Sequence, residues 1–207
     1  AELFHQQGHD MTKFCIPAPT DSDYIAVDTN EAVQQELNYD EVEESDKANE
    51  QYLKLNSDQK AAFDVITAAV DNEQGSLYFI DAPGGTGKTF LIQTLLAHVR
   101  GQKKIAVAMA TSGIASTLLP GGGTVHKKLI VPLEVHDNTM CSYEDNGPIA
   151  NLVKTASLMI IDEATLGDRR MYECLNRTFQ HHRENELPFG GVTMVFTGDW
   201  RQCLPVV

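Results

Sequence analysis

The sequence predicts an α/β fold in which a mostly parallel sheet is flanked by helices and preceded by an acidic, flexible leader. Short apolar runs suited to buried strands alternate along the chain with segments of helical periodicity. This alternation favours parallel strands joined by helices that cover both faces of one sheet. With 207 residues, the chain is long enough to bury one core of this kind.

The acidic charge gathers at the start of the chain. Residues 1–57 hold 13 acids and 3 bases, a net charge of −10, whereas residues 58–207 hold 16 acids and 13 bases, a net charge of −3. The densest acidic run, residues 40–46, can bury little apolar surface, and we expect a solvated, mobile linker there. We therefore divide the chain into a partly disordered leader, residues 1–54, and a main domain, residues 55–207.

The main domain opens with a helix that Ser57 can cap and that residues 72–75 would end. Its apolar residues follow the spacing of one buried face: Ala62, Val65, Ile66 and Ala69. Strands are expected at residues 77–80, 105–110, 158–161 and 193–196, and further helices at 88–100, 114–119 and 169–182. Residues 120–156 are glycine-rich and irregular, which favours a long functional loop.

Polar residues directly follow the expected strands. They are Asp81, Thr111, Asp162 and, after Gly198, Asp199. Ligands of open α/β sheets bind at the carboxyl ends of the strands, so we expect the site at that edge.

A glycine-rich turn joins the first expected strand to the next helix. Residues 82–89 approach the phosphate-binding pattern G-x-x-x-x-G-K-[ST], with Ala82 where the pattern has its first glycine. Glycines let backbone N–H groups wrap phosphates, the lysine reaches the β and γ oxygens, and the hydroxyl serves magnesium. The alternative is a turn that only joins strand to helix. The pattern predicts a nucleoside triphosphate site with Mg²⁺ at Gly84, Gly85, Thr86, Gly87, Lys88 and Thr89.

Two adjacent acids end a buried run of four apolar residues. Asp162 would hold magnesium through its water shell, and Glu163 would orient and deprotonate an attacking water. Taken alone, the pair could equally be a strand end that meets solvent. A carboxylate beside the first acid points to hydrolysis rather than to phosphorylation of a small molecule.

Two glutamines complete the predicted site. Gln202 follows the last strand and can hydrogen-bond a γ-phosphate or the lytic water. Gln59 precedes the glycine turn, and its amide can both donate to and accept from an adenine edge. An ordinary helix start explains Gln59 about as well when it is taken alone.

Together with Leu55–Asn56 before Gln59, Thr111–Ser116, residues 121–126, Pro188–Gly191 and residues 198–207, these motifs resemble the first motor domain of the PIF-one family of superfamily-one DNA helicases. The resemblance covers about residues 56–207. Residues 14–19 of the leader are similar to the lead-in of the eukaryotic and Helitron-transposon branch of that family.

The resemblance implies a RecA-like domain of an ATP-driven helicase that unwinds DNA from 5′ to 3′ in repair, recombination and telomere maintenance. It implies ATP and Mg²⁺ as cofactors, and single-stranded DNA and duplex junctions as partners. Thr111 and Ser112, with His126 and Lys127 and with Lys128 beside them, fall where the family grips single-stranded DNA. Hydroxyls and a small basic cluster suit phosphate contacts, although residues 126–128 could also be a solvated turn.

In the family, a second motor domain supplies arginines to the γ-phosphate. We therefore expect a C-terminally truncated protein that binds ATP, hydrolyses it poorly alone and unwinds nothing, as a fragment or a decayed transposon copy. Two alternatives stay open: a small-molecule kinase built on the same turn, and a catalytically inactive nucleotide-binding remnant.

The compartment is predicted from what the sequence lacks. No basic leader precedes an apolar run, the four cysteines form no close pair, and no apolar stretch approaches the roughly 18 residues of a membrane span. These absences favour an intracellular protein without membrane contact. We expect it in the nucleus, with the mitochondrion as an additional compartment.

Overall fold

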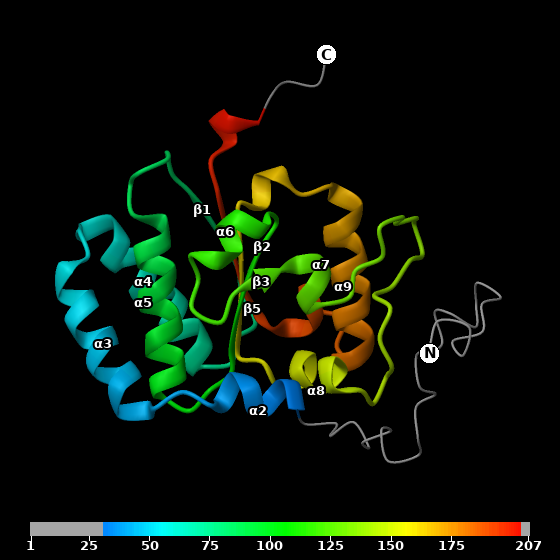
Figure 1. Ribbon diagram of the computed structural model, residues 1–207, viewed down its shortest axis with the longest axis horizontal. Helices are drawn as coiled ribbons and strands as arrows, with labels where there is room; N and C mark the ends of the chain where they lie inside the picture. The colour runs from blue at the N-terminus through cyan, green and yellow to red at the C-terminus, as the bar shows by residue number, and fades with distance from the viewer. Residues whose placement is uncertain (1–30, 204–207) are drawn as a thin grey trace, which may run out of the picture.

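A five-stranded parallel sheet organises the computed structural model, which describes residues 31–203. The strand order is β1-β5-β4-β2-β3, and every neighbouring pair is parallel. The strands are β1 (Leu77–Asp81), β2 (Ala106–Ala110), β3 (Gly123–Thr124), β4 (Leu158–Asp162) and β5 (Thr193–Gly198). The predicted fold class, a parallel sheet flanked by helices, is confirmed (Figure 1).

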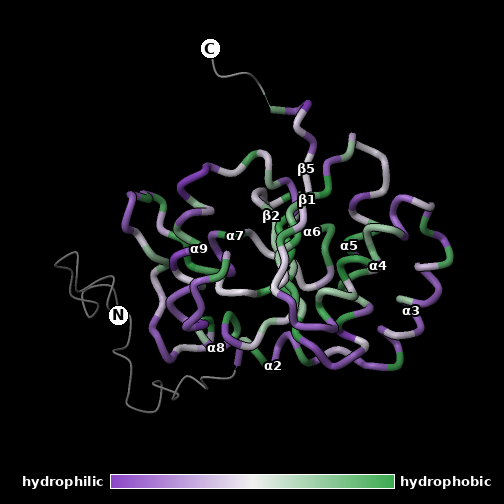
Figure 2. Tube along the Cα trace, turned by 180° about the vertical axis from the view of Figure 1, so that it is seen from behind, coloured by the Kyte–Doolittle hydropathy of each residue, from purple (hydrophilic) through white to green (hydrophobic). Residues whose placement is uncertain are grey.

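Helices cover both faces of the sheet. On one face lie α4 (Ser57–Asp71) and α5 (Lys88–Gly101), and on the other lie α8 (Pro148–Thr155) and α9 (Arg169–Arg183) (Figure 1). Successive residues of β2 alternate between the two cores: Val107 joins the α8–α9 side and Ala108 joins the α4–α5 side. Because both faces are covered, β2 and β4 are buried throughout, as the apolar centre of Figure 2 also shows.

The helix before the phosphate turn is capped one residue earlier than expected. Asn56, and not Ser57, is the N-cap of α4: its side chain accepts from the N–H of Gln59, and the Gln59 side chain accepts from the N–H of Asn56. This reciprocal pair is a capping box. It fixes Gln59 at the start of the helix, facing the sheet edge that carries the site.

The segment 120–156, expected to be one long irregular loop, contains β3, α7 (Val125–Lys128) and α8. None of these three elements was predicted. For β3 and α7, two and four residues are too few for a periodic signal. Within residues 31–203, the short connecting elements are α6 (Gly113–Thr117) and three 3₁₀ turns, η2 (Ala164–Leu166), η3 (Pro188–Gly191) and η4 (Trp200–Gln202).

The acidic run at residues 40–46 is helical, so the prediction of a mobile linker there is wrong. Residues 31–54 form α2 (Glu31–Leu37) and α3 (Glu41–Lys54). Asp40 caps α3 by accepting from the N–H groups of Val42 and Glu43, both at 2.9 Å. Acids in a first turn also favour a helix because they face the positive end of its dipole. α3 packs along the outside of α5 (Figure 1).

A buried ion cluster joins the leader to the main domain. Glu36 of α2 is 4 % exposed and accepts from Arg100 at 3.3 Å and from Lys128. The Arg100 guanidinium also lies 3.9 Å from the ring centroid of Tyr39 and donates to the carbonyl of Pro120 at 3.1 Å. Lys128, expected beside the predicted DNA contacts, is tied to the leader through Glu36, and its contact with DNA stays a prediction.

Several predictions fall on residues outside the described range. They are the leader up to residue 30, with its similar segment 14–19, and the motif residues 204–207. The boundary between residues 54 and 55 stays a prediction. Between residues 31 and 203, no helix is both long and apolar enough to span a bilayer.

Candidate nucleotide site and nucleic-acid interface

The glycine-rich turn of residues 82–87 joins β1 to α5 at the carboxyl end of the sheet. Gly85 and Gly87 have φ angles of 77° and 89°, in the left-handed region that glycine adopts without steric cost. A Cβ atom at Gly87 would also lie 2.7 Å from Nε2 of Gln59. Because α5 begins at Lys88, the unpaired N–H groups of a helix N-terminus face this turn, and such groups bind anions.

Lys88 and Gln59 both contact the backbone of the turn. Nζ of Lys88 donates to the carbonyl oxygen of Ala82 at 2.6 Å. Nε2 of Gln59 donates to the carbonyl oxygen of Thr86 at 3.1 Å, while its Oε1 accepts from the N–H of Asn56 at 3.0 Å. Gln59 thus uses both ends of its amide to connect α4 to the turn. Its predicted contact with adenine stays a prediction.

A cavity of about 360 Å³ lies between α4 and the turn. Its lining includes five residues of the predicted site and its surroundings: Asn56, Gln59, Thr86, Gly87 and Lys88. Gly84 and Gly85 are exposed on the turn, and Thr89 is half-buried in the first turn of α5. The cavity has the size of a small-ligand pocket.

The two acids at the end of β4 differ in how they are held. Asp162 is 4 % exposed, and its Oδ1 accepts from the hydroxyl of Thr197 and from the N–H of Glu163. Glu163 has φ 54° and ψ 36°, a left-handed conformation that is uncommon outside glycine. Within residues 31–203, no group hydrogen-bonds its carboxylate. Backbone strain of this kind gathers at functional sites. The carboxylate of Asp162 is thus fixed by hydrogen bonds, whereas that of Glu163 is available to bind a ligand or a water molecule.

Gln202 lies beside the phosphate turn. Its Nε2 donates to Oδ2 of Asp199 at 3.2 Å, and a Cβ atom at Gly84 would lie 3.6 Å from the same nitrogen. Asp199 also accepts from Nε of Arg201 at 2.9 Å, and this hydrogen bond holds the pKa of Asp199 below its ordinary value. The structure therefore brings Gln202 to the turn that carries Lys88.

Of the four predicted DNA contacts, Thr111 and Ser112 follow β2, and His126 and Lys127 lie on α7. The hydroxyl of Thr111 donates to the backbone carbonyl of Glu163 at 2.8 Å, and Oγ of Ser112 accepts from an N–H of α6 at 3.2 Å. Thr111 and His126 line a second cavity of about 360 Å³. Lys127 is exposed beside it, and among residues 31–203 the hydroxyl proton of Ser112 has no acceptor. Thr111 thus joins the candidate DNA surface directly to the candidate catalytic residue.

Two residues of the site had no role of their own in the sequence prediction, although each left a signal. Thr197 is a hydroxyl inside a buried strand, and a buried polar group needs a partner, here Asp162. Asn56 stands three residues before Gln59, the spacing of a capping box. Beyond the site, Asp81 of β1 accepts from the N–H of Trp200 at 3.3 Å, which ties η4 to the sheet.

Residues 54–207 match a family model described as PIF1-like helicase. The ATP-dependent DNA helicase Pif1 of Psychrobacter sp. is 25 % identical over 150 residues, which cover 72 % of this chain and 22 % of that protein. The ATP-dependent DNA helicase RRM3 of Saccharomyces cerevisiae is 29 % identical over 133 residues, covering 62 % of this chain and 18 % of that protein.

A solved structure is similar in fold as well. The crystal structure of Bacteroides Pif1 bound to ssDNA aligns with a TM-score of 0.56 at 26 % identity, over 69 % of this chain and 33 % of that one. The chain thus spans about a fifth of the two curated relatives and a third of this structure.

Proposed function

Because the chain belongs to the PIF1-like helicase family, we propose that it is the ATP-binding half of a DNA helicase motor. The observation that carries the proposal is the convergence of three segments on one sheet edge. Lys88 begins the helix after the phosphate turn, Asp162 and Glu163 lie at the end of β4, and Gln202 lies in the 3₁₀ turn after β5. The site binds nucleotide, and the finer proposal is that this nucleotide is ATP with Mg²⁺.

The chain's own groups account for phosphate binding and for the attack by water. N–H groups of the turn and of the first turn of α5 would hold phosphate oxygens, joined by the ammonium of Lys88. The carboxylate of Glu163, free of protein partners among the described residues, would orient a water molecule and accept its proton.

The donor set fits magnesium. The hydroxyl of Thr89 and the carboxylate of Asp162 are hard oxygen donors, which Mg²⁺ prefers. Of the Asp162 oxygens, Oδ1 is occupied by Thr197 and the N–H of Glu163, so Oδ2 is the one to face an ion or its water shell. When bound, the ion neutralises phosphate charge.

Single-stranded DNA is the proposed partner of the surface at Thr111, Ser112, His126 and Lys127. The Bacteroides structure, by its description, holds ssDNA, and the exposed His126 and Lys127 of this chain stand beside a cavity that Thr111 lines. We extend the proposal to duplex junctions, to 5′-to-3′ unwinding in repair, recombination and telomere maintenance, and to action in the nucleus or the mitochondrion.

ATP turnover of the full-length protein that contains this chain tests the proposal. We expect single-stranded DNA to stimulate turnover, and Glu163→Gln to lower stimulated turnover by about 100-fold or more while ATP binding stays. Glu186→Gln, an exposed acid away from the sheet edge, is the matched control. Equal turnover of Glu163→Gln and wild type would reject the catalytic role.

The same assay separates the alternatives. A phosphorylated small-molecule product without any effect of DNA would indicate a kinase. ATP binding that Lys88→Ala abolishes, with no turnover in the full-length protein under any condition, would indicate an inactive remnant.

A further inference from the structure

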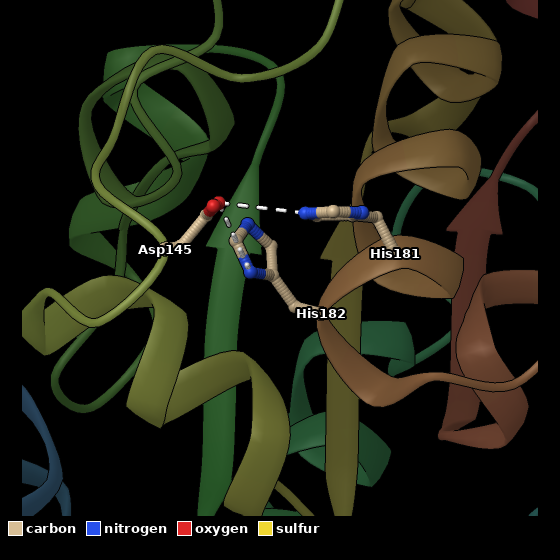
Figure 3. A group of neighbouring side chains, drawn as sticks. All are labelled: Asp145, His181 and His182. Atoms are coloured by element: carbon tan, nitrogen blue, oxygen red, sulfur yellow. Dashed lines mark ion pairs between the residues drawn. The ribbon is translucent and has the colours of Figure 1, made fainter.

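Asp145, His181 and His182 form a cluster that includes none of the residues of the nucleotide site. Asp145 lies in the loop before α8, and the two histidines lie in the last turn of α9. One potential ligand atom from each residue lies within 4.8 Å of the other two. Figure 3 shows the three side chains pointing toward one another. The geometry points to a site for a divalent transition-metal ion, with Zn²⁺ as its typical occupant.

The distances between the ligand atoms suit an ion with tetrahedral coordination once the side chains have rotated slightly. Nε2 of His181 and Nδ1 of His182 lie 3.4 and 4.0 Å from Oδ1 of Asp145. Zinc bonds of about 2.1 Å place ligand atoms roughly 3.4 Å apart in a tetrahedron. Two imidazoles and one carboxylate leave the fourth position to solvent, and this donor set suits zinc better than magnesium or calcium.

One ligand is fixed and two can adjust. The side chain of His182 is 3 % exposed and its ring stacks on Tyr143, with centroids 5.1 Å apart. The side chains of His181 and Asp145 are 55 % and 73 % exposed, so they can close on an ion without moving the core.

The charges around the cluster have opposing effects on a bound cation. The C-terminal end of α9 carries the negative end of its helix dipole, which attracts cations. Lys154 opposes this attraction, because its charge acts on His182 and its ammonium donates to the backbone carbonyl of Asp145 at 3.2 Å. We therefore expect weaker binding than at thiolate zinc sites.

The ion would add a third clamp between α9 and the loop of residues 129–147. Nη2 of Arg177 already donates to the carbonyl of Thr139 at 2.8 Å, and the hydroxyl of Thr178 accepts from the N–H of Cys141 at 3.0 Å. His181 and His182 stand one helical turn further along the same face. The same loop lines the cavity beside Thr111 and His126, so the ion would fix part of that wall.

Zinc titration of the 207-residue chain by calorimetry, in millimolar Mg²⁺ to occupy hard-ligand sites, tests the inference. We expect one Zn²⁺ per chain and a raised unfolding midpoint. His181→Gln and Asp145→Asn, both at exposed positions, should each weaken zinc binding by at least about tenfold and remove the rise in midpoint.

Glu144→Gln is the matched control, because Glu144 is an exposed acid beside Asp145 that lies outside the cluster. It should leave zinc affinity within about twofold of wild type. Absence of zinc binding would overturn the inference, and so would binding that survives both substitutions. Equal weakening by Glu144→Gln would also overturn it, since that result indicates attraction by surface charge alone.

Discussion

Two glutamates, Glu36 where the leader packs on the main domain (the leader junction) and Glu163 at the sheet edge, have opposite environments. At the leader junction, Glu36 is buried and its carboxylate is paired with Arg100 and Lys128. At the sheet edge, Glu163 has a strained backbone fixed by neighbours, while no group of residues 31–203 hydrogen-bonds its carboxylate. The first arrangement uses charge to hold elements together, and the second keeps charge available for a ligand.

This contrast predicts a separation of effects. Changes at the sheet edge should alter nucleotide chemistry with little change in the free energy of unfolding. Changes at the leader junction should do the reverse, because removing one partner of a buried ion cluster leaves the other charges unpaired.

Lys88→Ala should have the largest effect. Removing the ammonium should lower ATP turnover of the full-length protein by about 100-fold or more, because a charged donor to the phosphates is lost. The free energy of unfolding should change by less than about 1 kcal/mol, since the side chain is half-buried and its ammonium donates to backbone carbonyls rather than to a buried charge. Steady-state turnover and chemical denaturation measure the two quantities. Lys54→Ala, at an exposed ion pair, is the control.

Glu36→Ala should mainly affect stability. It leaves Arg100 and Lys128 without their carboxylate, and we expect a loss of about 3 kcal/mol in the free energy of unfolding. Nucleotide affinity of the variant, measured below its unfolding midpoint, should stay within about twofold of wild type. Glu31→Ala on the exposed side of the same helix should cost little. A large loss of nucleotide affinity with unchanged stability would contradict the contrast.

Asn56→Ala tests a residue with both a structural and a binding role, since it caps α4 and lines the nucleotide cavity. We expect about 1 kcal/mol of lost stability from the cap, and weaker nucleotide binding because Gln59 loses its reciprocal partner. Ser57→Ala is the matched control, and denaturation together with nucleotide titration distinguishes them. If Ser57→Ala cost as much as Asn56→Ala, the capping assignment would be wrong.

Asp199→Asn should have the smallest effect. The hydrogen bond from Arg201 lowers the pKa of Asp199 in the folded protein below 3.8, so the unfolded chain binds its proton first as pH falls. The stability that this carboxylate contributes is therefore present above pH 3.8 and is lost as pH falls through the lower folded pKa. Unfolding midpoints of wild type and variant should differ at neutral pH and converge in acid. A constant difference down to the acid limit would argue against this ion pair.

The sequence predicted the sheet edge well and the leader junction poorly, for a physical reason. Lys88, Asp162 and Gln202 follow short apolar runs, so local pattern placed them at strand ends. The sites of Glu36 and His182 depend on partners distant along the chain, such as Arg100 and Asp145. No local periodicity encodes such pairings. The prediction for the acidic run at residues 40–46 was wrong for a different reason. Its composition indicates a solvated segment, but the cap at Asp40 starts a helix there.

The ion cluster of Glu36, Arg100 and Lys128 also has a mechanical consequence, since it connects α7 to α5. A motor that moves along DNA pulls on the surface that grips it, and α7 carries the proposed contacts His126 and Lys127 together with Lys128. Lys128 holds Glu36, which holds Arg100 near the end of α5, the helix that starts at Lys88. Those 14 residues form a rod of roughly 21 Å. Tension at the DNA surface would thus reach the phosphate turn along a single stiff helix, braced by a segment that precedes the motor domain in the chain.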